Sequence, residues 1–78
     1  MSKHIKSDLP SAPLERILKE ITGLLVSASA VDELKRVLIE ISEEIATDAA
    51  DLSRHAGRKT IKDKDIDLAY KNLMKKVR

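Results

Sequence analysis

The feature that most constrains this chain is a long apolar stripe in its middle, which no Gly or Pro interrupts before Gly57. Steps of three and four residues separate the members of the stripe, which are Val31, Leu34, Leu38, Ile41, Ile45, Ala49 and Leu52. This spacing is typical of one face of an α-helix. With Ser27 or Ser29 as its N-cap, the stripe predicts a single helix of about 29 residues, roughly 43 Å long.

Shorter amphipathic segments flank the stripe. After Pro13, helical spacing relates Leu14, Ile17, Leu18, Ile21 and Leu25, and Gly23 is placed to end a helix of about ten residues in the left-handed conformation. A last helix of about 13 residues, roughly 20 Å long, is predicted from Asp63. Its apolar face consists of Ile66, Ala69, Tyr70, Leu73 and Val77. The predicted fold class is therefore all-α, with a short, a long and a short helix.

The unequal helix lengths predict a dimer. Two short helices cannot cover the whole apolar stripe of a helix that is twice as long as either of them. A second copy, with the two long helices crossing near their middles, would bury both stripes. A long antiparallel coiled coil is the alternative, but the stripe is not a strict heptad and the short helices would have no place in it.

Composition limits the classes of function. The 78 residues include no Cys, which excludes disulfides and thiolate metal sites, and His4 and His55 have no recognisable metal spacing. We expect neither a metal nor another cofactor. One Tyr is the only aromatic residue, so stacking platforms for single-stranded bases are missing.

The chain reads as one domain, residues 9–78, preceded by a mobile N-terminal arm at residues 1–8. The start, MSKHIKSDLP, lacks the apolar run of a signal peptide, and no stretch is long enough to span a membrane. We therefore expect a soluble, cytoplasmic protein without a membrane partner.

Charge is unevenly distributed, although the net charge is only +2. Residues 40–51 carry acids and no cation, whereas residues 54–62 carry four Lys or Arg and no acid. The acidic run offers no catalytic pair, because adjacent residues such as Glu43 and Glu44 point in different directions on a helix. We expect no enzymatic activity and no small-molecule substrate.

Two segments, LPSAPLERILKE near the start and RHAGRKTIKDKDIDLA near the end, resemble the archaeal histones. The resemblance runs from about Leu9 to Lys76 without an apparent gap, and HAGRKTIK followed by Asp65 is its most specific part. It implies the histone fold, a head-to-tail handshake homodimer, and binding and compaction of double-stranded DNA.

The residues that we expect to contact DNA lie on the first helix and in the loop after the long helix. They are Arg16, Lys19, Arg58, Lys59, Thr60 and Lys62. Basic side chains and loop amides can bind phosphates without reading bases, so the affinity would be electrostatic and largely independent of sequence. The resemblance implies that Arg58 pairs with Asp65 and braces the loop, which makes its role mainly structural. From the sequence alone, Arg16 and Lys19 fit solvated helix charges equally well.

Two residues depart from the family pattern. Leu25 stands where the family commonly has an Arg that enters the minor groove, which removes a cation and adds an apolar side chain. Glu15 places an acid on the first helix near the expected phosphate path. Both changes favour weaker or differently arranged DNA binding than in a wrapping histone.

Four further residues, Leu52, His55, Asp65 and Leu68, match family positions that join one dimer to the next. Tetramers or longer assemblies are therefore expected, although a His at a helix end is also common as a surface residue or cap. If Leu25 is instead buried in another tetramer interface, the assembly would bridge two duplexes rather than bend one.

These observations predict a DNA-organising protein that is associated with the chromosome in the nucleoid. The alternative, favoured by Leu25, is a histone-fold interaction module that has a protein as its main partner and binds DNA only secondarily.

Overall fold

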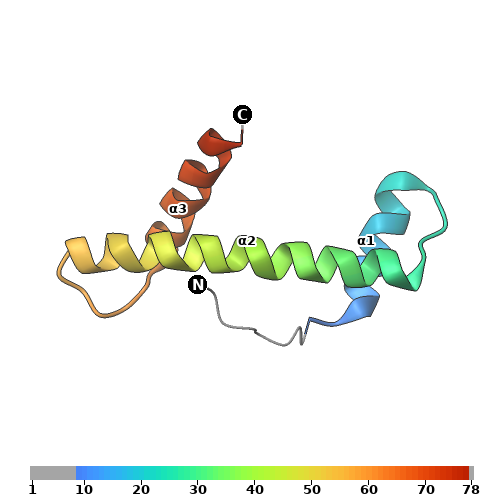
Figure 1. The fold of residues 1–78 in the computed structure, drawn as a ribbon, viewed down its shortest axis with the longest axis horizontal. Coiled ribbons are helices and arrows are strands. Elements are labelled where there is room, and N and C mark those ends of the chain that lie inside the picture. Colours follow the sequence, from blue (N-terminus) through green and yellow to red (C-terminus); the bar gives the residue numbers. More distant parts are fainter. Residues whose placement is uncertain (1–8, 78) are drawn as a thin grey trace. The chain divides into compact units, whose positions relative to one another are not determined.

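The computed structural model describes residues 9–77, and these residues form three helices and no strand (Figure 1). The helices are α1 (Ser11–Thr22), α2 (Ala28–His55) and α3 (Asp63–Lys76). The predicted all-α class and the short, long, short order are confirmed. The mobile arm predicted at residues 1–8 lies outside the described residues. The chain divides into two compact units, and the boundary between them follows Glu40, within α2.

In the first unit, α1 begins earlier than predicted. Its first residue is Ser11, so Pro13 lies inside the first turn rather than before it. Pro is tolerated there because the first N–H groups of a helix have no partner within the helix. The predicted end of α1 is correct: Gly23 has φ of 71° and donates its N–H to the Lys19 carbonyl over 2.8 Å.

Ser27 is the N-cap of α2. Its Oγ accepts the backbone N–H of Ala30 at 3.0 Å, and its carbonyl accepts the N–H of Val31. Of the two predicted caps, Ser27 therefore has this role. The helix has 28 residues, one fewer than predicted.

In the second unit, small side chains are buried on both helices. Ala49 of α2 is fully buried and Ala69 of α3 is 1% exposed, which permits close approach because the distance between helix axes depends on the contacting side chains. A hydrogen bond of 3.2 Å from Asn72 Nδ2 to Asp48 Oδ2 also joins the two helices.

The apolar core of the described residues is small. Its buried apolar members are Val31 in the first unit and Ala49 and Ala69 in the second, and the described residues of neither unit include a fully buried large side chain. Many large apolar side chains remain exposed, among them Ile17, Ile21, Leu24, Leu25, Ile61, Ile66, Leu68 and Met74. Exposed apolar surface of this extent is characteristic of chains that associate.

Candidate nucleic-acid interface

The connection between α2 and α3, residues 56–62, is called the basic loop below. It leaves α2 through a Schellman motif, in which Arg58 donates its N–H to the Ser53 carbonyl and Gly57 to the Arg54 carbonyl, both over 2.9 Å. Gly57 has φ of 74°, a left-handed conformation that Gly adopts without steric cost. The direction in which the chain leaves α2 is therefore fixed by backbone hydrogen bonds.

The Ser53 hydroxyl holds the basic loop in place. This serine is buried in the last turn of α2, and its hydroxyl lies 3.2 Å from the Arg58 carbonyl and 2.9 Å from the Thr60 carbonyl. One hydroxyl thus contacts two carbonyls of the loop. These contacts fix the middle of the loop against the helix.

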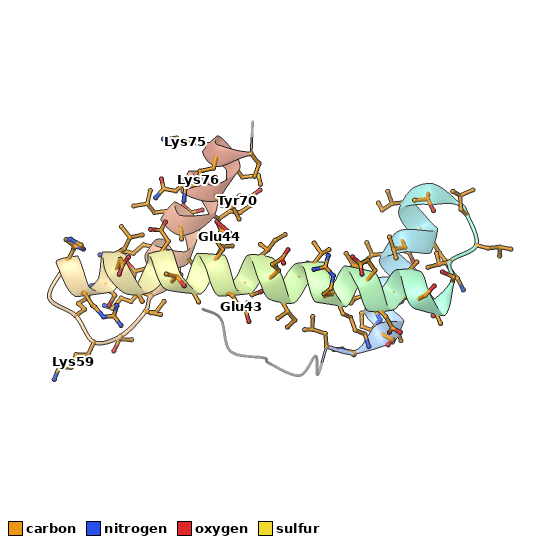
Figure 2. The ribbon with its side chains drawn as sticks, viewed as in Figure 1. Glu43, Glu44, Lys59, Tyr70, Lys75 and Lys76 are labelled. Carbon is orange, nitrogen blue, oxygen red and sulfur yellow. The ribbon has the colours of Figure 1, made fainter. Side chains whose placement is uncertain are left out.

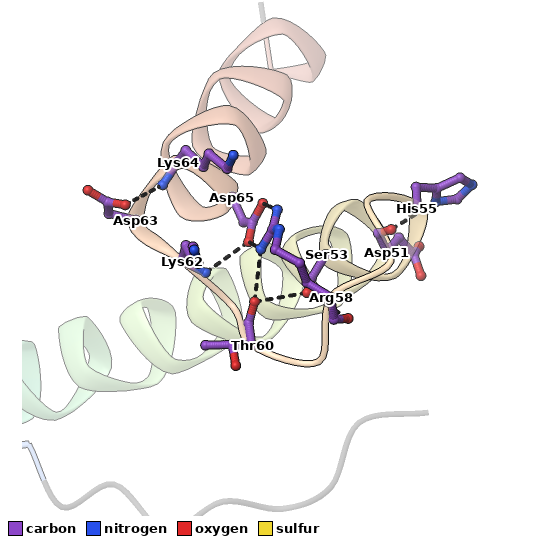
Figure 3. A network of polar contacts seen from close by, with 9 residues as sticks. All are labelled: Asp51, Ser53, His55, Arg58, Thr60, Lys62, Asp63, Lys64 and Asp65. Carbon is purple, nitrogen blue, oxygen red and sulfur yellow. Dashed lines mark hydrogen bonds and ion pairs between the residues drawn. The ribbon is translucent and has the colours of Figure 1, made fainter.

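Arg58 and Asp65 close the loop against α3 (Figure 3). Arg58 Nη1 donates to Asp65 Oδ2 over 2.9 Å, and Nη2 donates to Oδ1 over 2.8 Å, which makes the ion pair bidentate. Nη1 also donates to the Thr60 carbonyl over 2.9 Å. Bidentate Arg–carboxylate pairs are among the stronger and more directional polar contacts.

Asp65 also caps α3. Its Oδ2 accepts the backbone N–H of Lys62 over 2.8 Å, so the carboxylate serves the N-terminal end of the helix as well as the arginine. The hydrogen bonds from Arg58, and then that from Lys62, hold the pKa of the Asp65 carboxyl well below its ordinary range. The same pairing raises the pKa of the Arg58 guanidinium.

The pair leaves the lysines as the uncompensated charges of the basic loop. The side chains of Arg58 and Asp65 are only 21% and 4% exposed, and their charges offset each other. Lys59 and Lys62 are exposed and form no ion pair within the described residues. Figure 2 shows Lys59 extending from the loop away from both helices.

Arg16 and Lys19 lie in the first unit, on α1. Lys19 Nζ is 3.0 Å from Glu15 Oε2, so Glu15 offsets one of the two predicted cations. Arg16 is exposed and has no ion pair within the described residues. The uncompensated charge of this helix face therefore belongs to Arg16.

The residues predicted to join dimers have different surroundings in the single chain. His55 and Leu68 are exposed, and Leu52 is half-buried. His55 Nδ1 lies 2.8 Å from the Asp51 carbonyl, a local contact within α2. Asp65, in contrast, is buried and already paired with Arg58.

The described residues contain no carboxylate pair at Glu43 and Glu44, no metal site and no membrane-spanning helix. Glu43 and Glu44 project from different sides of α2 (Figure 2), so they form no carboxylate pair. No group of His, Asp and Glu in residues 9–77 is arranged to hold a metal ion. Within the same residues, no helix has the length and apolar character that crossing a membrane requires.

A family model described as the core histone domain matches residues 1–72. The chain belongs to the histone family. This histone is 38% identical over 65 residues to an archaeal histone HAN1 subunit of Thermococcus zilligii, a match that covers 83% of this chain and 97% of the relative. It is 42% identical to probable archaeal histone 3 of Methanocaldococcus jannaschii, with the same coverage.

A third relative is DNA-binding protein HmvA of Methanocaldococcus jannaschii. The identity is 47% over 58 residues, which are 74% of this histone and 60% of the relative. The resemblance to archaeal histones and the predicted histone fold are thereby confirmed.

Sequence reasoning missed two polar contacts of this histone. Ser53 is one Ser on a helix face and carries no sequence signal for its two loop carbonyls. The contact from Asn72 to Asp48 joins residues 24 positions apart, and a pairing at that separation depends on how α2 and α3 pack. The sequence signal for Asn72 is its position three residues after Ala69, which places a polar side chain on the buried face of α3.

Proposed function

We propose that this histone binds double-stranded DNA through its phosphates, without sequence preference, and helps to organise the chromosome. The observation that carries the proposal is the basic loop, which is held rigidly from Ser53 and Asp65 and presents Lys59 and Lys62 to solvent. The names of the three relatives, two archaeal histones and one DNA-binding protein, support it.

Rigidity matters because phosphate contacts position a protein on DNA. A loop that is already ordered loses little conformational entropy when it binds. The exposed Lys59 and Lys62 ammonium groups can each neutralise a phosphate, and the Thr60 hydroxyl can donate a hydrogen bond to another. Arg58, which is engaged by Asp65, acts in this proposal mainly by holding the loop in shape.

We infer that the DNA-binding form is a homodimer, and that Arg16 and Lys19 add to its DNA surface. The small core and the exposed apolar residues support association of two chains. Leu52, His55, Asp65 and Leu68 are proposed to join dimers into tetramers or longer assemblies, with the Asp65 carboxylate remaining paired with Arg58. We propose that this histone works without a cofactor, a catalytic activity or a membrane partner. We also propose that it is located on the chromosome.

The test is fluorescence anisotropy with two unrelated duplexes at several salt concentrations from about 50 to 200 mM, a range over which several phosphate contacts change affinity by orders of magnitude. We expect equal affinity for both duplexes and a steep loss with salt. Negligible binding at the lowest salt concentration, or a strong preference for one sequence, would contradict the proposal.

A second candidate function is a protein-interaction module with secondary DNA binding, and Leu25 is the observation that favours it. Leu25 lies in the loop between α1 and α2 and is 97% exposed, next to the exposed Leu24. An exposed apolar loop suits a protein partner better than phosphate. Replacement of Leu25 by Arg separates the two: a gain in DNA affinity with unchanged assembly favours the first function, and loss of assembly with unchanged DNA affinity favours the second.

A further inference from the structure

The C-terminal end of α3 carries a second group of exposed cations. Lys75 and Lys76 are exposed in the last turn of the helix and form no ion pair within the described residues. Lys71, one turn earlier, is different, because its Nζ lies 3.0 Å from Asp67 Oδ2. The uncompensated charge of this end of α3 therefore belongs to Lys75 and Lys76, which are called the α3-end lysines below.

The α3-end lysines are far from the basic loop within the same unit. Lys75 lies thirteen positions after Lys62, about 20 Å along a helix. Figure 2 shows Lys59 on one side of α2 and the α3-end lysines on the other side, where α3 ends. A duplex that contacts Lys59 would have to pass around α2 to reach them.

Lys64, next to Asp63 in the first turn of α3, is exposed and forms no ion pair within the described residues. The rest of the surface between the two cationic groups is acidic or neutral. The second half of α2 presents Glu43, Glu44 and Asp48 with no cation among residues 41–53. The middle of α3 contributes the internally compensated pair of Asp67 and Lys71. Glu44 lies on the α3 side of α2 in Figure 2, yet no ion pair joins it to the α3-end lysines. Carboxylates repel phosphates, so the DNA that binds the basic loop does not extend across this surface.

From this charge distribution we propose that the α3-end lysines form a second phosphate-binding surface, which holds a second DNA duplex. The inference rests on the proposed function, because the first duplex must bind at the basic loop. Two separate cationic surfaces on one protomer let an assembly join two duplexes. A dimer doubles the number of contacts on each side, which strengthens individually weak phosphate contacts through multivalency.

The test compares two double variants that remove equal charge. Lys75→Gln/Lys76→Gln removes the α3-end lysines, and Lys59→Gln/Lys62→Gln removes the lysines of the basic loop. A biotinylated duplex on beads and a fluorescent duplex in solution report joining, and anisotropy with one duplex reports simple binding. Light scattering at the same protein concentration reports the mass of the assembly, and thermal unfolding reports stability.

We expect Lys75→Gln/Lys76→Gln to keep the single-duplex affinity within about twofold, to keep the wild-type mass, and to lower capture of the second duplex by about tenfold, as loss of phosphate contacts implies. The loop variant should lose both activities. The proposal is overturned if the α3-end variant captures the second duplex as well as wild type does, even when its melting temperature is lower; the lysines would then serve only the helix dipole.

Other outcomes would also overturn the proposal. An equal loss of single-duplex affinity in both variants would mean one continuous DNA surface, and a lower mass of the α3-end variant would assign its effect to assembly. If the wild-type protein binds one duplex and captures no second, the inference fails and the proposed function stands. If it binds no duplex at all, the proposed function itself fails.

Discussion

At the scale of single residues, Asp65 has two structural roles at once. Its carboxylate receives both terminal nitrogens of Arg58 and the backbone N–H of Lys62, so it joins the basic loop to the start of α3. Removal of the Arg58 or the Asp65 side chain would leave the other charged group nearly buried and with unsatisfied hydrogen bonds, a costly state in a protein interior. The conformation of the loop therefore depends on Asp65 remaining ionised.

The depressed pKa of Asp65 predicts a loss of stability in acid. The pKa is lower in the folded than in the unfolded protein, so the stabilisation is complete above the unfolded value, about 3.9, and decreases as the pH falls below it. We expect the free energy of unfolding of the wild type to exceed that of Asp65→Asn at about pH 6, and the difference to shrink as the pH falls from about 5 to about 3. Urea titrations at constant protein concentration measure it; a constant difference would contradict the assignment.

Ser53 supplies a second prediction at this scale. Replacement of Ser53 by Ala leaves the Arg58 and Thr60 carbonyls without their hydroxyl partner, and we expect a loss of about 1–2 kcal/mol in the free energy of unfolding. Ser42→Ala is the matched control, because Ser42 is exposed on the same helix, and should change stability by less than about 0.5 kcal/mol. Equal effects of the two substitutions would show that Ser53 does not hold the loop.

At the scale of helices, the ends of the elements are determined mainly by local chemistry. Gly23 and Gly57 end α1 and α2 in left-handed conformations, and Ser27 begins α2. These positions could be predicted because each depends on a single residue type and its neighbours. The predicted start of α1 is wrong because the first turn of a helix accepts Pro, so Pro13 does not mark a boundary.

Gly57 tests this local control. No atom lies within 4 Å of the position that a Cβ would occupy, so the cost of Gly57→Ala is the positive φ alone, about 1 kcal/mol in the free energy of unfolding. Gly57→Asn should cost less, because Asn tolerates the left-handed conformation better. Chemical denaturation of both variants measures the order, and Asn being at least as destabilising as Ala would contradict it.

At the scale of the whole molecule, the central feature is apolar surface that one chain cannot bury. The length of the α2 stripe predicts this feature from the sequence. The polar contacts within the second unit, from Asn72 to Asp48 and from Ser53 to the loop, could not be predicted, because they depend on how α2 and α3 pack. The positive charge of the basic loop could be predicted from the distribution of charge along the sequence. The ion pair with Asp65, which offsets the charge of Arg58, followed only from the family resemblance.

The dimer predicts a melting temperature that rises with protein concentration, since association stabilises only the folded state. Sedimentation equilibrium should give at least twice the mass of one chain. Ile21 is 81% exposed in the single chain. Ile21→Glu replaces this apolar side chain by a charged one and should weaken association, whereas Glu20→Gln at the neighbouring position should not. A concentration-independent melting temperature, with the mass of a single chain, would exclude the dimer.

The most direct test of the central claim, that the basic loop binds DNA phosphates, is the salt dependence of duplex affinity for Lys59→Ala. Each lost phosphate contact lowers the slope of log affinity against log salt by about 0.9, so a dimer that uses both loops should lose about two units, equally for unrelated sequences. Lys71→Ala, which removes a lysine already paired with Asp67, is the matched control and should leave the slope unchanged. An unchanged slope for Lys59→Ala would show that the basic loop does not contact DNA.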